Sequence, residues 1–370
     1  MASPIDPMVK TYSMPTPKVS KKLVVISGIF CAIYGLDELP AHTKEVTCLY
    51  LMHPRLSAMD CMEGVAALAI ADWNKRLQDG KTSPEQANKG LIAVAFDQRN
   101  HGSRLVDKLS NDAWRQGNPH HAQDMFATFQ GTARDVSFLI DFLPSYAFPT
   151  SPIQITTNLV LGVSLGAHAG WCCILHEPRI TGAVIIVGCP DYLNLMVDRA
   201  RLSKLPSWTS SSPPGAKIMG SEAFPQGFLD RVRHLDPAAF FLKHMAESAV
   251  PAPIRDGPIP EPTEKEKEIL CPVLSQSLAG KRILLLSGGS DKLVPYHRGE
   301  AFLTWLKKAI SPDGGWFADG GVSLEDLIFE GVGHEVTPEM VDHAIEFIGE
   351  SLLAGDDTKG SVGKVRTSKI

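Results

Sequence analysis

The chain has 370 residues, of which 44% are hydrophobic and 21% charged, and such values are typical of a globular protein with a large buried core. The formal net charge is −5 and no basic stripe is present, so electrostatics give no reason to expect nucleic-acid binding. The seven cysteines form no C-x-x-C pair, which favours free thiols in a reducing compartment over a disulfide framework.

The first 18 residues, MASPIDPMVKTYSMPTPK, are rich in proline and serine, and we expect residues 1–18 to form a disordered tail. This segment lacks the apolar core of a signal peptide. No run in the chain approaches the length of a membrane span. We therefore expect a soluble intracellular protein without a membrane span.

From residue 23 onward, short apolar runs alternate with helical patterns. The runs are typical of strands covered on both faces, and they lie at 23–30, 46–52, 91–96, 157–163, 182–188, 282–288 and 326–333. Helical spacing occupies 62–77, 125–143, 165–176, 299–310 and 339–353. This alternation predicts an α/β fold with a mostly parallel, doubly wound sheet.

The alternation stops between about residues 190 and 280, where two proline-rich stretches, 207–215 and 250–262, separate short helical pieces. We expect a helical cap or lid over 191–279, inserted into a core formed by 19–190 and 280–354. The charged run 264–268 is predicted to be a solvated helix face. Residues 355–370 are polar, and we expect a flexible tail.

The stretch LVLGVSLGAHAG, residues 159–170, contains a G-x-S-x-G pattern centred on Ser164. A strand-like run ends at the first glycine, and a helical pattern follows the serine. This context favours a nucleophile held on a sharp strand–helix turn over a serine that lies by chance between two glycines.

A serine nucleophile needs a base and an acid that orients the base. His334 follows the last apolar run and precedes the final helix, so it is the candidate base. Asp291, after the run 282–288, is the preferred acid, because this fold places the three groups in the order serine, acid, histidine. Asp191, which follows the preceding strand, is the alternative acid.

Stabilising an oxyanion requires two N–H donors. The first is predicted to be the backbone N–H of Leu165, directly after the serine. The second should come from the loop after the third strand, here 51–60, where the usual donor is one residue beyond Pro54. Arg55 therefore keeps the role, although proline itself has no N–H. We interpret His53 as a residue that orients this loop.

Other polar clusters have simpler structural interpretations. The segment DQRNHGSR, residues 97–104, is predicted to brace the floor of the site through Arg99, His101 and Gly102. The cluster of His120, His121 and Asp124 lacks a further metal ligand at a convincing spacing. His168 and His176 are predicted to serve packing or to lie at the surface. No metal or cofactor is required.

In combination, DQRNHGSR, GVSLG, GGSDKLVP and GVGH occur in the order typical of one family. Residues 20–353 resemble an α/β-hydrolase of the lipase/esterase type. The resemblance implies an α/β-hydrolase fold and a serine esterase, lipase or thioesterase. Epoxide hydrolases and haloalkane dehalogenases of this fold use an aspartate where Ser164 stands, so their mechanism is not expected.

The sequence ends in Ser368-Lys369-Ile370, a one-residue variant of the S-K-L peroxisomal address, on a polar and basic tail. We therefore expect recognition by the peroxisomal import receptor and a peroxisomal location. With the segment 118–136, this ending makes the chain similar to fungal peroxisomal hydrolases. Among these, it most resembles the hydrolase of the AK-toxin and ACT-toxin clusters of Alternaria, which make a decatrienoic acid building block.

We expect hydrolysis of a carboxylic ester or an acyl-CoA thioester, in toxin or other secondary-metabolite biosynthesis. Three alternatives stay open at this point. The same acyl-enzyme could serve an acyltransferase or cyclase, or a peroxisomal lipase or thioesterase of general lipid metabolism, or the fold could be retained for binding only. The cap aromatics are interpreted equally well as the wall of an acyl pocket or as ordinary packing; they are Trp208, Phe224, Phe228, Phe240 and Phe241.

Overall fold

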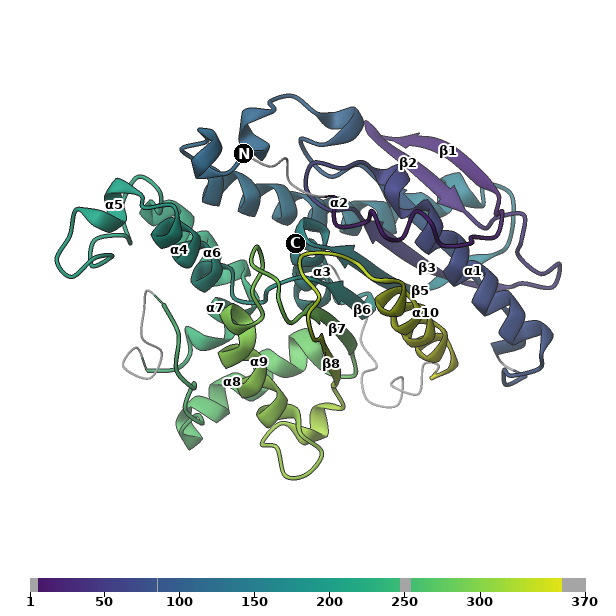
Figure 1. The fold of residues 1–370 in the computed structure, drawn as a ribbon. Coiled ribbons are helices and arrows are strands. Elements are labelled where there is room, and N and C mark those ends of the chain that lie inside the picture. The colour runs from purple at the N-terminus through teal and green to yellow at the C-terminus, as the bar shows by residue number, and fades with distance from the viewer. Residues whose placement is uncertain (1–5, 85, 247–253, 355–370) are drawn as a thin grey trace.

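A computed structural model describes residues 6–84, 86–246 and 254–354 (Figure 1). Its centre is one eight-stranded sheet in the order β1-β2-β4-β3-β5-β6-β7-β8. The strands are β1 (Lys21–Ile26), β2 (Ile29–Tyr34), β3 (Glu45–Met52), β4 (Lys89–Phe96), β5 (Gln154–Val163), β6 (Ile180–Ile186), β7 (Arg282–Gly288) and β8 (Ser323–Phe329). Strands β3 to β8 pair in parallel, whereas β1 and β2 pair antiparallel. The prediction of a mostly parallel sheet is confirmed.

The run 23–30 forms a hairpin instead of one strand. Strands β1 and β2 are joined by Ser27 and Gly28, whose φ angles are 48° and 84°. Two consecutive residues with positive φ make the tight turn that matches the twist of an antiparallel pair. Because apolar residues flank this dipeptide on both sides, the hydrophobicity pattern alone does not reveal the turn.

Helices cover both faces of the sheet (Figure 1). Helices α1 (Glu63–Gln78) and α10 (Pro338–Leu353) pack together. Their apolar residues and those of one face of the sheet form one hydrophobic layer. The other layer contains apolar residues from α2 (His121–Ala147), α3 (Leu165–His176), α8 (Glu264–Leu278) and α9 (His297–Ile310). Within the described residues, no helix is both long and apolar enough to cross a membrane.

The insertion between β6 and β7 contains only helices and loops in its described part. Helices α4 (Tyr192–Leu202), α5 (Pro206–Thr209), α6 (Gln226–Leu235) and α7 (Pro237–Leu242) form it. In Figure 1, α4, α5 and α6 project beyond the sheet. The expected cap, 191–279, includes helix α8. In the structure, α8 packs against α3 of the core and buries three leucines, Leu270, Leu274 and Leu278. Helix α8 therefore contacts both the core, through α3, and the insertion, through α7.

Residues 6–14 do not form the disordered tail that their composition predicts. We call them the N-terminal strap. The Met8 side chain is fully buried in the layer that contains α1 and α10. The carbonyl of Pro7 accepts a hydrogen bond from the Val336 N–H at 2.8 Å, and Lys10 pairs with Glu335 at 2.9 Å. These contacts offset the entropy cost of ordering a proline-rich segment.

Replacing Met8 by alanine is expected to lower the free energy of unfolding by about 2–5 kcal/mol, because the change removes fully buried apolar volume. Urea unfolding of the purified variant measures this loss. Val9→Ala is the matched control, since its neighbouring side chain is 52% exposed and should change stability little. Equal stability of the two variants would show that the strap contributes nothing to the fold.

Candidate functional site

Ser164 lies on a strained turn between β5 and α3. Its φ and ψ angles are 54° and −109°, a combination that is costly for a residue with a side chain. The Ser164 N–H donates to the Ile186 carbonyl at 2.9 Å, which ties the turn to the end of β6. The serine is 8% exposed and lies at the carboxyl edge of the sheet. This is the strand–turn–helix geometry expected of a nucleophile elbow.

Two glycines make this turn sterically possible. A Cβ atom at Gly162 would lie 2.1 Å from the Gly166 carbonyl oxygen, and one at Gly166 would lie 2.1 Å from the Met52 carbonyl oxygen. Both neighbours are backbone atoms, which cannot swing away as the end of a side chain can. The close approach also seats the loop after β3 directly on the turn.

The Gly166→Ala substitution is expected to destabilise the protein by about 3 kcal/mol or more, because a backbone segment must move to admit the methyl group. Thermal unfolding of the soluble fraction would detect this change. Gly227→Ala on α6 is the matched control, since a Cβ there meets no atom within 4 Å. A Gly166 variant as stable as this control would contradict the packing argument.

Three side chains from separate strand ends form a continuous hydrogen-bonded chain. The Ser164 Oγ lies 2.9 Å from the His334 Nε2, and the His334 Nδ1 lies 2.7 Å from an Asp291 carboxylate oxygen. Asp291 follows β7 and His334 follows β8. With Nδ1–H donating to the carboxylate, Nε2 is left to accept the serine proton.

The carboxylate of Asp291 is held in its ionised form. Burial acts to raise the pKa of Asp291, but the hydrogen bond and charge of His334 and two backbone donors outweigh it, and the pKa falls below its ordinary value. Those donors are the N–H groups of Leu293 and Val294, at 2.8 and 2.9 Å. A fixed anion at this point orients the imidazole.

Asp191 is committed to another contact. It caps the N-terminus of α4 by accepting from the Asn194 N–H at 3.2 Å. Its two carboxylate oxygens also accept from the Arg255 guanidinium, both at 2.7 Å. The structure therefore joins Asp291, and not Asp191, to His334.

One predicted oxyanion donor directly follows Ser164, and the other belongs to the loop that contacts the nucleophile turn. Leu165 is the first residue of α3, so its N–H has no acceptor within the helix. Arg55 lies in the loop that follows β3, whose Met52 and His53 carbonyl oxygens lie against Gly166. This position fits the predicted role of the Arg55 N–H, which stays a prediction.

His53 holds this loop in place. Its imidazole is fully buried, with Nδ1 donating to the Pro54 carbonyl at 2.7 Å and Nε2 accepting from the Gln98 N–H at 3.0 Å. Burial lowers the pKa of His53 to about 4, so the ring is neutral at pH 7. The loop-orienting interpretation of His53 agrees with these contacts.

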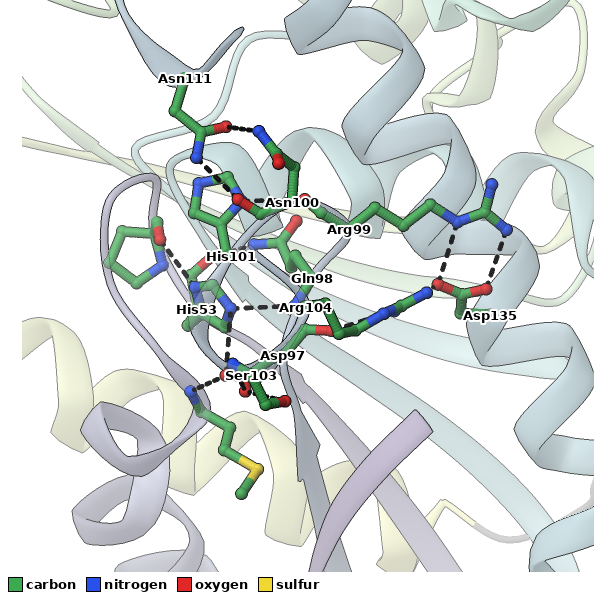
Figure 2. Close-up of polar contacts among 12 residues, drawn as sticks. His53, Asp97, Gln98, Arg99, Asn100, His101, Ser103, Arg104, Asn111 and Asp135 are labelled. Carbon is green, nitrogen blue, oxygen red and sulfur yellow. Dashed lines mark hydrogen bonds and ion pairs between the residues drawn. The ribbon is translucent and has the colours of Figure 1, made fainter. Parts of the chain in front are cut away.

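The loop 97–104 is braced by a network of polar contacts (Figure 2). The Asp97 carboxylate accepts from the N–H groups of Met59 and Ser103 at 2.8 and 2.7 Å. Gly102 has a φ of 51°, and a Cβ there would approach the Asp97 carboxyl carbon to 2.2 Å. The glycine is therefore required by both backbone conformation and space.

The same loop is fastened to α2 by charge. Arg99 and Arg104 both pair with Asp135, at 2.9 and 2.8 Å (Figure 2). His101 turns back on its own loop, with Nδ1 lying 2.9 Å from the Arg99 carbonyl. These contacts fit the structural roles that the motif predicts.

His121, His168 and His176 lie near backbone groups or pack against aromatic rings. Nδ1 of His168 lies 3.1 Å from the Cys189 carbonyl, and Nε2 of His176 lies 2.9 Å from the Leu235 carbonyl. The His121 ring packs edge-on against Trp114, at 5.1 Å between centroids. Asp124 accepts from the Asn118 amide at 3.0 Å.

The cap aromatics pack mainly with one another and with the core. Phe224 and Phe241 are fully or almost fully buried, and Phe241 stacks on Phe302 of α9. A separate cavity of about 610 Å³ lies among the cap helices. Its apolar lining comes from Leu193, Met219, Leu229, Val232, Ala239, Leu242 and Met245. Packing thus accounts for these aromatics without a substrate.

Arg199 also lies beside the site, and nothing in its local sequence singled it out. It is one of several cations in the helical piece 198–205. In the structure its guanidinium Nη2 donates to the Leu293 carbonyl at 2.6 Å, next to the Asp291 loop. Only the packing of α4 over the sheet edge distinguishes it from its neighbours.

Comparison with known structures finds several that are similar to this chain. TT1662 from Thermus thermophilus is similar with a TM-score of 0.52 and 17% identity, over 91% of this chain and 99% of that one. A cold-adapted esterase from an Arctic intertidal metagenomic library has a TM-score of 0.44 and 14% identity, over 91% of this chain and 99% of its own. A putative dipeptidyl aminopeptidase IV from Bacteroides ovatus has a TM-score of 0.46 and 12% identity; 91% of this chain matches 36% of that enzyme.

The family of the chain is identified from its sequence. Comparison with curated proteins finds no significant match. A family model described as the alpha/beta hydrolase family matches residues 71–348, which is most of the chain. That model and the Thermus thermophilus structure confirm the predicted fold. The chain belongs to the alpha/beta hydrolase family.

Proposed function

We propose that the protein is a serine hydrolase that cleaves a carboxylic ester or an acyl thioester. The observation that carries this proposal is the unbroken contact from Ser164 Oγ through the His334 imidazole to the Asp291 carboxylate, at 2.9 and 2.7 Å. Such a chain makes an otherwise poor hydroxyl nucleophile reactive. Membership of a hydrolase family supports the same conclusion.

The proposed reaction has two halves. The His334 Nε2 takes the proton from Ser164 as its oxygen attacks the acyl carbonyl, and the N–H groups of Leu165 and Arg55 stabilise the oxyanion. The protonated imidazole then gives its proton to the leaving alcohol or thiol, and an acyl-enzyme forms. Water, deprotonated by His334, releases the acid and restores the serine.

Hydrolysis of a matched panel tests this proposal. Acyl-CoA thioesters and oxygen esters of the same acids, from short to long chains, would be incubated with the protein and with the Ser164→Ala variant. Turnover that disappears in the variant is expected, and the preferred bond and chain length would identify an esterase, lipase or thioesterase. Turnover that appears only with an added alcohol or amine would instead identify an acyltransferase.

The biological setting is proposed from sequence resemblance alone. We place the reaction in fungal secondary metabolism, on an acid of the decatrienoic type, and in the peroxisome. Ser368, Lys369 and Ile370, the proposed ligand of the import receptor, lie outside the described residues. A fluorescent protein carrying residues 355–370 should enter peroxisomes, and the same fusion without the last three residues should stay outside.

A further inference from the structure

Two arginines belong to, or contact, the loops that carry the Ser164–His334–Asp291 site. On one side, the Arg199 guanidinium donates to the Leu293 carbonyl at 2.6 Å, and the Leu293 N–H donates to Asp291 at 2.8 Å. On the other side, the Arg55 guanidinium donates to the Asn111 carbonyl at 2.6 Å. Arg55 belongs to the loop seated on the nucleophile turn, whereas Arg199 lies on helix α4 and contacts the loop that carries Asp291.

Neither guanidinium has an ion-pair partner among the residues that the structure describes. The other Arg199 contacts are the sulfur atoms of Met125 and Met196, at 3.5 and 3.6 Å, and sulfur is a weak acceptor. The Nε of Arg199 is buried and has no hydrogen-bond acceptor within the described part of the chain. Asp198, the adjacent carboxylate, is bound by Arg201 instead, at 2.6 Å.

The charges of Arg55 and Arg199 affect each other. Burial, and then the charge of Arg199, lowers the pKa of Arg55 to about 10, and Asp112 opposes this only in part. Burial lowers the pKa of His121 to about 2, with further contributions from Arg199 and Arg55. His121 is therefore neutral at pH 7, and its buried Nδ1 lacks a partner among the described residues. Like charges that repel each other in a partly desolvated place are costly unless an anion joins them.

We propose that Arg55 and Arg199 bind an anionic group of the substrate, a carboxylate or a phosphate, while Ser164 attacks its ester or thioester carbonyl. This inference rests on the proposed function and adds the substrate class to it. The planar guanidinium pairs geometrically with either oxyanion. The carboxylate would belong to the half-ester of a dicarboxylic acid, and the phosphate would belong to the coenzyme A part of a thioester.

The test compares substrates that differ only in charge. Mono-4-nitrophenyl adipate and 4-nitrophenyl hexanoate have the same chain length, and hexanoyl-4'-phosphopantetheine and hexanoyl-pantetheine differ in one phosphate. We expect kcat/KM to favour one charged member by about 10- to 100-fold, the worth of one charge-assisted contact. Preference for the adipate identifies a carboxylate, and preference for the phosphopantetheine thioester identifies a phosphate.

Variants connect this preference to the arginines. Arg199→Met and Arg55→Met are expected to reduce the charged-to-neutral ratio of kcat/KM at least 10-fold, with partial recovery in Arg199→Lys. Arg231→Gln, an exposed arginine of α6, is the control and should keep the wild-type ratio. An equal loss on both members of a pair would mean that the arginines only position the loops, and it would overturn the proposal.

A binding measurement separates this inference from the proposed reaction. Adipate, hexanoate and inorganic phosphate would be titrated calorimetrically into the Ser164→Ala protein, with and without Arg199→Met. Binding of adipate or phosphate that the second substitution removes supports the anion site even if no ester is hydrolysed. Ester hydrolysis without charge preference and without anion binding would overturn the site and leave the hydrolase proposal standing.

Discussion

The Ser164→Ala variant is expected to lower kcat for the preferred ester or thioester by about 10⁶-fold. No other described side chain lies in hydrogen-bond contact with the His334 Nε2 on the face where an acyl carbonyl must be attacked. The turn that holds the serine is maintained by backbone contacts and by two glycines, so the alanine should keep the fold. Binding of a product acid should persist, since the change removes only one oxygen atom.

Initial rates with enzyme in excess would measure this loss above background hydrolysis. Ser210→Ala, an exposed serine at the end of α5, is the matched control and should keep full activity. A covalent phosphonate label should attach to Ser164 in the wild type and to no residue in the variant. Retained turnover in Ser164→Ala would contradict the acyl-enzyme mechanism and favour direct attack by water.

The second large effect is expected from Asp291→Asn, with a loss in kcat of about 10⁴-fold. The asparagine can present an N–H to the His334 Nδ1, which favours the tautomer with a proton on Nε2. That nitrogen could then no longer accept the proton of Ser164. The fold should survive, because the amide oxygen can still accept the two backbone N–H groups at 2.8 and 2.9 Å.

Asp191→Asn is the informative partner of this experiment, since both aspartates follow strands of the same sheet. It weakens the bidentate pair with the buried Arg255, and loss of a buried ion-pair partner costs about 3–5 kcal/mol. We therefore expect reduced stability in urea but unchanged kcat per folded molecule, counted by active-site titration. The reverse pattern, with chemistry lost in the Asp191 variant, would identify Asp191 as the acid.

The alternation of apolar runs with helical patterns predicts most of the core, because the apolar residues that form the pattern are those that folding buries. It also places Ser164, Asp291 and His334 at three strand ends, and parallel strands bring those ends to one edge. It cannot distinguish Asp291 from Asp191, because both positions obey the same rule. The distinction depends on Arg255, which comes from the proline-rich stretch 250–262 and reaches Asp191 only in the folded chain.

The remaining differences also have tertiary causes. The composition of residues 6–14 indicates disorder, whereas the burial of Met8 depends on residues at the other end of the chain. The helical pattern of α8 is the same whether it belongs to a cap or to a crossover, and its contact with α3 appears only in the folded chain. Arg199 is recognisable beside the site only once α4 lies over the Asp291 loop.

The N-terminal strap has a consequence for the order of folding. Its hydrogen bond joins Pro7 to Val336, and its ion pair joins Lys10 to Glu335, directly after His334. These contacts of the strap can therefore form only after nearly the last described residues are in place. Closing a loop of this length also has an entropy cost. During synthesis, the sheet can form from β1 to β7 before the histidine loop acquires its support. The contact between Ser164 and His334 should thus form in a final docking step, after most of the core has already formed.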